Sequence, residues 1–275
     1  MTWTTAPAAL RVRQWLHFVP LPLASMAVLT PGRVALACTA TAASLAFAWG
    51  INSIADRLGD DPAKNPIAGH VRVGRELPAL LAALVLLALI LSAALGLSAL
   101  VAMFASLASG ALYSAGPRLK RWPGAGLVAN TLIFVPLLAL GLDDRVAHAA
   151  FPMLLAVFTA LLLQNQLLHE LADADEDARS EVLTTARALG VRGTLALVFT
   201  FGVVGAAVAG TLAQSFLPAL AMLACTLVPF APNTGLGTAS GGAAVLATSW
   251  SRVRLAHRVA CVIAGALLFA WGRVS

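Results

Sequence analysis

The chain has 275 residues, of which 60% are hydrophobic and only 11% are charged, and its mean hydropathy is +0.87. This composition excludes an ordinary soluble globular domain and is typical of multi-spanning membrane proteins. The net charge of +6 is spread along the chain and indicates contact with membrane lipids and no binding of nucleic acid.

Nine apolar stretches are long enough to cross a bilayer, because a spanning helix needs about 20 mostly apolar residues. The boundary between the third and fourth stretches rests on a turn at Gly96. We therefore predict an all-α integral membrane protein, a nine-transmembrane-helix bundle that forms a single domain over 1–275. The predicted spans are 14–31, 34–55, 77–95, 97–115, 124–142, 149–170, 193–213, 215–233 and 253–271.

The basic residues agree with this count, since Lys and Arg concentrate in short cytoplasmic loops. With the N-terminus in the cytoplasm, 15 of the 18 basic residues fall in cytoplasmic segments. Only Arg33, Arg145 and Arg273 then lie on the outer side. We therefore predict a multi-pass protein with a cytoplasmic N-terminus.

Two sets of three polar residues lie at the ends of apolar stretches, and within each set the residues are four positions apart. Each residue of the second set lies 117 positions after its counterpart in the first. At helical pitch this spacing places the three side chains of a set on one flank. The pseudo-repeat at 52–60 and 169–177 predicts two related elements of one site on the cytoplasmic side. The first ladder is Asn52, Asp56 and Asp60, and the second ladder is His169, Asp173 and Asp177.

The four ladder aspartates are too costly to leave in lipid, at about 2.5–3.5 kcal/mol each on insertion scales. Either ladder alone could be an ordinary solvated helix end, with salt bridges to Arg57, Arg179 or Arg187 satisfying part of the charge. However, the stretch 170–181 holds six acidic residues and one arginine. Such oxygen ligands favour Mg²⁺, which proteins often share between a few carboxylates and substrate phosphates, whereas softer metals would call for Cys or clustered His.

Three stretches occur in the order NSIADRLGD (52–60), YSAGPRLKR (113–121) and HELADADED (169–177), the last followed by TTARALG (184–190). Together they resemble the hallmark motifs of the UbiA superfamily of intramembrane prenyltransferases. The resemblance implies a Mg²⁺-dependent enzyme that transfers a prenyl group from a prenyl diphosphate to a lipophilic or aromatic acceptor. It also implies a central apolar cavity that opens to the cytoplasmic side and takes the isoprenoid tail.

The resemblance also implies roles for individual residues. The catalytic residues and ligands of two Mg²⁺ ions would be Asp56, Asp60, Asp173 and Asp177. The residues that contact substrate would be Asn52, Lys64, Tyr113, Arg118, Lys120, His169 and Glu170.

Two positions depart from the family pattern. His169 stands where the family usually has Asn, and a histidine there can orient a ligand, act as a base, or make a supporting hydrogen bond at a helix end. After the first ladder the family often reads R-P-x-x-S-G, while this chain has Lys64-Asn65-Pro66. The lysine replaces an expected arginine, so the acceptor's identity stays open.

Two other functions fit parts of the pattern. A UbiA-type terpene cyclase would also ionise a prenyl diphosphate to an allylic cation. It would then quench this cation within the prenyl chain. An ion-coupled secondary transporter would bind its coupling ions on intramembrane acids, but the acids here cluster at one membrane side rather than at mid-depth. The sequence makes no prediction about prenyl chain length or oligomeric state.

Overall fold

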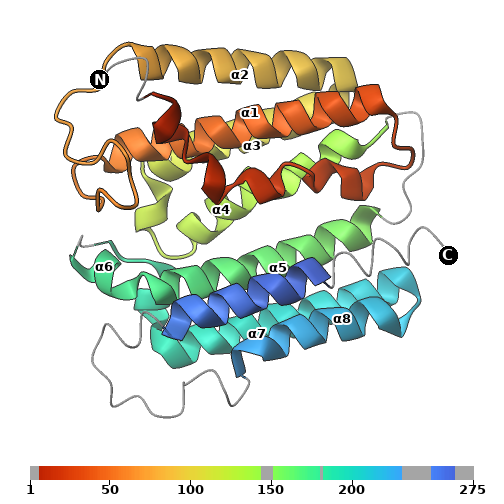
Figure 1. Ribbon diagram of the computed structural model, residues 1–275. Helices are drawn as coiled ribbons and strands as arrows, with labels where there is room; N and C mark the ends of the chain where they lie inside the picture. The colour runs from red at the N-terminus through yellow and green to blue at the C-terminus, as the bar shows by residue number, and fades with distance from the viewer. Residues whose placement is uncertain (1–5, 144–150, 180–181, 231–248, 264–275) are drawn as a thin grey trace. The chain divides into compact units, whose positions relative to one another are not determined.

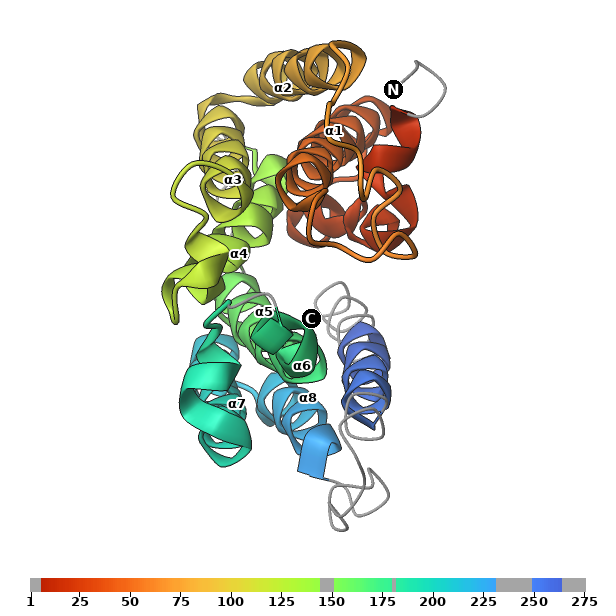
Figure 2. The same ribbon diagram turned by 90° about the vertical axis from the view of Figure 1, so that its left-hand side faces the viewer.

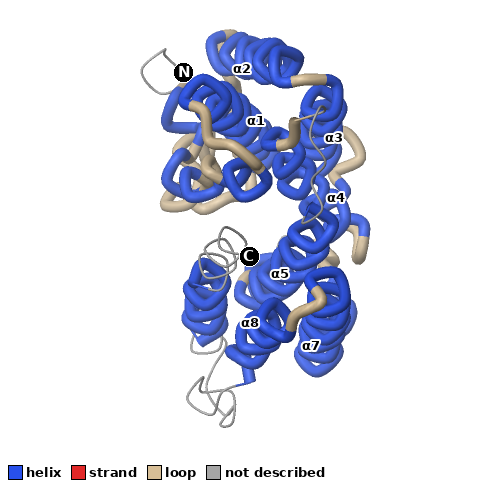
Figure 3. The backbone as a smooth tube through the Cα atoms, turned by 90° about the vertical axis from the view of Figure 1, so that its right-hand side faces the viewer, coloured by secondary structure: helices blue, strands red, loops and turns tan. Residues whose placement is uncertain are grey.

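Helices form every regular element that the computed structural model describes, in residues 6–143, 151–179, 182–230 and 249–263, and no strand occurs in these ranges (Figures 1 and 3). Arg145 and Arg273 lie outside the described residues, as do residues 149–150, 231–233 and 264–271 of the predicted spans 149–170, 215–233 and 253–271. The all-α prediction is therefore confirmed for the described part of the chain.

Five helices are long and apolar enough to cross a membrane, and they lie where spans are predicted. Shorter apolar helices cover Ala125–Gly141 and Phe216–Phe230, and residues 249–263 form a further helix. The chain is thus a multi-pass integral membrane protein. The long helices are α1 (Pro31–Asp56), α2 (Glu76–Leu95), α3 (Leu97–Ser114), α5 (Phe151–Ala172) and α7 (Thr185–Ala213).

The predicted first span, 14–31, is not one continuous helix, which corrects the sequence-based prediction. The chain there forms short 3₁₀ helices, joined by bonds such as Phe18 N–H to the Trp15 carbonyl at 2.8 Å. The reason is Pro20 and Pro22, because a proline inside an α-helix lacks an N–H donor and clashes with the preceding turn. The 3₁₀ helices are η1 (Pro7–Leu10), η2 (Val12–Gln14), η3 (Leu16–Phe18) and η4 (Leu21–Ser25).

One glycine sets a helix boundary, and another interrupts a helix. Gly96 separates α2 from α3 with a φ of 137°, a conformation that residues with a Cβ rarely adopt. This confirms the predicted turn. α7 starts at Thr185, eight residues before the predicted span 193–213, and Gly190 interrupts its helical geometry with a φ of 66°.

The remaining helices are shorter. α4 (Ala125–Phe134) continues into η6 (Val135–Gly141), where Pro136 tightens the helix, and η5 (Leu119–Arg121) precedes α4. The segment α6 (Ala174–Arg179) follows α5, and α8 (Phe216–Leu227) continues into η7 (Val228–Phe230).

The chain divides into two compact units. The N-terminal unit comprises Met1–Leu119 and Leu132–His148, and in it α1 packs against α2 and α3 (Figures 1 and 2). The C-terminal unit comprises Lys120–Thr131 and Ala149–Ser275, and in it α7 packs against α5 and α8 (Figure 2). Each unit therefore carries one of the two ladders.

Candidate functional site

The first ladder lies at the end of α1. Asn52 and Asp56 are in its last turns, and Asp60 follows just beyond. The backbone N–H of Asp60 donates to the carbonyl of Asp56 at 2.9 Å, which is the bond that would continue an α-helix. The helical spacing of the ladder thus extends past the end of α1.

Residues of the YSAGPRLKR stretch contact the first ladder. Arg118 Nη2 donates to Asp56 Oδ1 at 2.7 Å, and Ser114 Oγ donates to Asn52 Oδ1 at 3.0 Å. Arg118 has a φ of 51°, which is uncommon for a residue with a side chain and often marks functional sites. Two of the three motifs thus form one polar cluster within the N-terminal unit.

Asp60 has partners that the motifs did not predict. Arg11 Nη1 lies 3.7 Å from Asp60 Oδ2, and Asn65 Nδ2 donates to the same oxygen at 3.1 Å. Asn65 is fully buried and also donates to the carbonyl of Ser53 at 2.9 Å. The available signals were an arginine before the first apolar stretch and an Asn-Pro pair, and both are common enough to be overlooked.

The other predicted substrate residues of this region lie on nearby parts of the chain. Lys64 is exposed in the loop between α1 and α2, and its backbone N–H donates to the carbonyl of Asp61 at 2.9 Å. Tyr113 is half-buried next to Ser114 in the last turn of α3, and Lys120 is in η5, which follows Arg118. Their roles toward a substrate stay predictions.

The second ladder spans the junction of α5 and α6. Asp173 N–H donates to the His169 carbonyl at 3.0 Å, and Asp177 N–H donates to the Asp173 carbonyl at 2.9 Å. The spacing of the ladder therefore stays helical across the break between the helices. His169 Nδ1 lies 3.1 Å from Asp173 Oδ2, so one ladder member is placed to orient the next.

Negative charge is crowded around Asp177. Burial, together with the charges of Asp173, Glu170 and Glu176, raises the pKa of Asp177 to about 7, and only Arg187 opposes this. The guanidinium of Arg187 donates to the backbone carbonyls of Asp177, at 3.2 Å, and Val182. Three acidic neighbours and one arginine therefore act on the Asp177 carboxyl, and a bound cation would relieve this repulsion.

Glu170 supports the start of α7. Its side chain is buried, with 6% exposed, and Oε2 accepts a hydrogen bond from the Ala186 N–H at 3.0 Å. Thr184 is the N-cap of α7 and accepts from the Arg187 N–H at 3.5 Å. Because the first N–H groups of a helix carry partial positive charge, the carboxylate of Glu170 ties α5 to α7. Its predicted contact with substrate stays a prediction.

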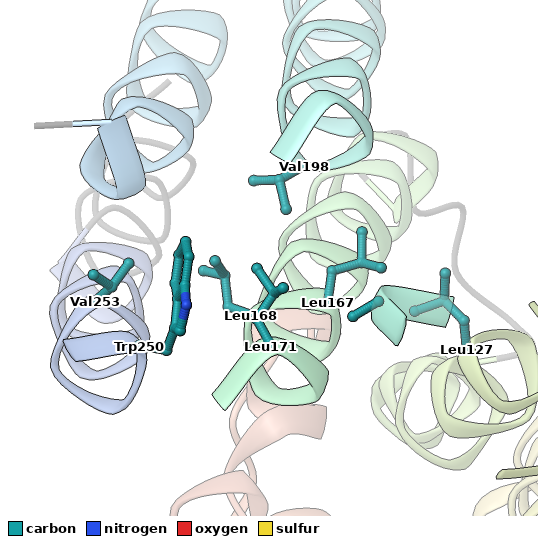
Figure 4. Close-up of a cluster of buried hydrophobic side chains, with 8 residues drawn as sticks. Leu127, Leu167, Leu168, Leu171, Val198, Trp250 and Val253 are labelled. Carbon is teal, nitrogen blue, oxygen red and sulfur yellow. The ribbon is translucent and has the colours of Figure 1, made fainter. Parts of the chain in front are cut away.

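A cluster of buried apolar side chains holds the last turns of α5 in place (Figure 4). It joins α5 to α4, to α7 and to the helix over 249–263. Such packing limits the movement of the helix that carries the second ladder. The cluster comprises Leu127, Leu167, Leu168, Leu171, Ala186, Val198, Trp250 and Val253.

Neither ladder is a complete metal site by itself. Among the described residues, no three His, Cys, Asp or Glu side chains converge closely enough to hold a metal ion. A hard cation bound at either ladder would therefore need further oxygens from water or a ligand, which is the usual situation for Mg²⁺.

Solved structures share this fold, although no protein-family model matches the sequence and no curated protein matches it closely. A UbiA homologue from Archaeoglobus fulgidus, bound to GPP and Mg²⁺, is 18% identical, with a TM-score of 0.72 over 95% of this chain and 99% of that chain. A digeranylgeranylglyceryl phosphate synthase is 13% identical, with a TM-score of 0.67 over 95% of this chain and 98% of that chain.

A third structure, a UbiA homologue from Aeropyrum pernix K1 solved in its apo form, is 19% identical. Its TM-score is 0.63 over 92% of this chain and 98% of that chain. At such identities the likeness establishes the architecture. The chain has the fold of the UbiA homologues, and the resemblance that its motifs predict is confirmed at that level.

Proposed function

We propose that this protein is a Mg²⁺-dependent intramembrane prenyltransferase that transfers a prenyl group from a prenyl diphosphate to a lipophilic or aromatic acceptor. The observation that carries the proposal is the presence of two aspartate ladders, each at the end of an apolar helix, in a chain with the UbiA fold. Support comes from the Archaeoglobus fulgidus homologue, which was solved with GPP and Mg²⁺ and also with DMAPP and Mg²⁺.

The side chains of the ladders fit Mg²⁺. The donor set of Asp56, Asp60, Asp173 and Asp177 consists of carboxylates alone, as a hard cation prefers. The raised pKa of Asp177 points the same way, because it results from burial and, in part, from the charges of acidic neighbours. When bound, Mg²⁺ would neutralise the diphosphate and stabilise the charge that this group gains as it leaves.

The basic and polar residues would position the diphosphate. Arg118 is already charge-paired with Asp56 and can donate in pairs to phosphate oxygens. Lys64 and Lys120 would add point charges. The remaining predicted contacts to the substrate are Asn52, Tyr113, His169 and Glu170.

The proposed reaction breaks the bond between C1 of the prenyl group and the diphosphate oxygen, and the electron pair leaves with the diphosphate. The resulting allylic cation is attacked at C1 by the acceptor, which then loses a proton. His169, held 3.1 Å from Asp173, would orient the bound substrate or accept that proton. The apolar spans would exclude water from the cation.

The proposed membrane topology rests on the distribution of the basic residues along the chain. We propose nine spans around a central apolar cavity that opens to the cytoplasm, with the N-terminus and both ladders on that side. The prenyl diphosphate would then arrive from the cytoplasm, while its tail and a lipophilic acceptor would lie among the spans and membrane lipids.

The test uses membranes that contain the protein, Mg²⁺ and labelled geranyl, farnesyl or geranylgeranyl diphosphate, together with a panel of acceptors. Diphosphate should be released, and EDTA should stop its release. Asp56→Asn and Asp173→Asn should each abolish turnover while the protein still inserts and folds. No release with any chain length would contradict the proposal, and a product with the mass of a prenyl hydrocarbon would identify a cyclase instead.

A further inference from the structure

Arg258 is a charged residue inside a predicted span that has no acidic partner among the described residues. It is the sixth residue of the predicted span 253–271 and is half-buried on the helix over 249–263. Its Nε donates to Asn165 Oδ1 of α5 at 3.0 Å. Arg258 lies toward the predicted cytoplasmic end of this span, and a half-buried cation within a span is costly and usually marks a functional site.

Asn165 continues the second ladder into the membrane. It lies four residues before His169, so it shares the flank of α5 on which the ladder lies. With a rise of about 1.5 Å per residue, it is about 6 Å along the helix from His169 and about 12 Å from Asp173. Arg258 therefore contacts the same flank of α5, below the carboxylates.

His257 and Gln164, the neighbours of Arg258 and Asn165, hold the helix over 249–263 in register with α5. His257 is fully buried, and its Nε2 lies 3.1 Å from Gln164 Oε1. The Nε2 of Gln164 donates at 2.9 Å to the Val198 carbonyl and at 2.9 Å to Thr226 Oγ1. Because the amide nitrogen of Gln164 is the donor in both bonds, its oxygen must accept from His257. This network fixes the helix over 249–263 without using Arg258.

We propose that Arg258, positioned by Asn165, binds an anionic oxygen group of a substrate, namely a carboxylate or a phosphate. Among the described residues, the bond to Asn165 uses one of the five N–H donors of the guanidinium, and the other four suit two-point binding of such a group. Asn165 lies about two helical turns from Asp173. An anion bound at Arg258 would therefore belong to the acceptor rather than to the diphosphate of the prenyl donor. The identity of this anion as a substrate rests on the proposed prenyltransferase function.

The test measures binding to the purified protein in lipid nanodiscs by the shift of the unfolding midpoint with ligand concentration. The probes are dodecyl phosphate, dodecanoate, uncharged dodecanol and Mg²⁺–pyrophosphate. The variants are Arg258→Gln, Arg258→Lys, Asn165→Ala and, as a matched control, Arg252→Gln, which removes an exposed arginine from the same helix.

The wild type should bind dodecyl phosphate or dodecanoate at least tenfold more tightly than dodecanol. Arg258→Gln should abolish this preference, Arg258→Lys and Asn165→Ala should reduce it, and Arg252→Gln should retain it. Unchanged pyrophosphate binding in Arg258→Gln would assign the anion to the acceptor, and a tenfold loss would assign it to the prenyl diphosphate.

The inference is overturned if Arg258→Gln alters neither binding measurement. Arg258→Lys keeps the charge and replaces the glutamine variant if that variant does not fold. The inference is also overturned if Arg258→Lys behaves as wild type in both measurements. Release of diphosphate from a labelled prenyl diphosphate is measured separately on the wild type. Its absence alongside an Arg258-dependent anion preference would overturn the proposed function alone.

Discussion

Arg118 Nη2 lies 2.7 Å from Asp56 Oδ1, so a residue that follows α3 is charge-paired with the first ladder at the end of α1. We predict that Arg118→Gln raises the KM for prenyl diphosphate about tenfold or more, because a hydrogen bond to a charged group contributes about 1.5–3 kcal/mol. Steady-state kinetics at saturating Mg²⁺ would measure this. Arg121→Gln, which removes an exposed arginine three residues away, should leave the KM unchanged, and equal KM values for both variants would argue against a role for Arg118.

The pKa of Asp177 predicts how stability depends on pH without Mg²⁺. This pKa is raised from 3.8 to about 7, so between these values the unfolded chain has lost a proton that the folded protein keeps. Stability should therefore fall as pH rises through this window and level off above it. Unfolding midpoints at pH 5, 6, 7 and 8 in EDTA would measure the trend. Asp177→Asn should flatten it and saturating Mg²⁺ should reduce it, whereas the same slope in wild type and Asp177→Asn would contradict the assignment.

Glu170 is predicted to contribute to stability through α7. Glu170→Ala removes the acceptor of the Ala186 N–H and the negative charge at a helix N-terminus, and should cost about 1–3 kcal/mol. Chemical denaturation in detergent would measure the loss. Glu170→Gln, which keeps an oxygen acceptor, should lose less. Asp175→Asn is the control, because Asp175 is exposed on α6, and a cost as large as that of Glu170→Ala would point to a general charge effect.

Gly202 is predicted to be required for the contact between α7 and α8. A methyl group at this residue would overlap the side chain of Thr226 and lie 2.6 Å from Nε2 of Gln164. Gly202→Ala should therefore destabilise the protein by about 1–3 kcal/mol, as measured by its unfolding midpoint. Gly32→Ala is the matched control in a helix, because no atom lies within 4 Å of the added methyl group. Similar midpoints for the two variants would show that the contact is not tight.

Features that depend on local spacing were predictable from the sequence. The long apolar runs of α1, α2, α3 and α5 became helices close to the predicted limits, because in lipid a backbone must satisfy its own hydrogen bonds. The spacing of four in both ladders survived the helix ends at Asp56 and Ala172 because backbone bonds continue there.

Contacts between distant segments were less predictable. The prolines at 20 and 22 interrupt a stretch whose composition alone suggested one continuous helix. The pairing of Arg11 and Asn65 with Asp60 depends on where the N-terminal turns and a loop fold back. Likewise, Asn165 and Arg258 are 93 residues apart, and neither belongs to a motif, so only the packing of two helices brings them together.

The central claim is that the two ladders together bind two Mg²⁺ ions with one diphosphate. Calorimetric titration of Mg²⁺ into the protein with geranyl thiolodiphosphate, an unreactive analogue, tests this directly. The account predicts two Mg²⁺ per wild-type chain and one in either Asp56→Asn or Asp173→Asn, while Asp61→Asn, which changes an exposed acid beside the first ladder, should keep two. Two bound ions in both ladder variants, or none in the wild type, would contradict it.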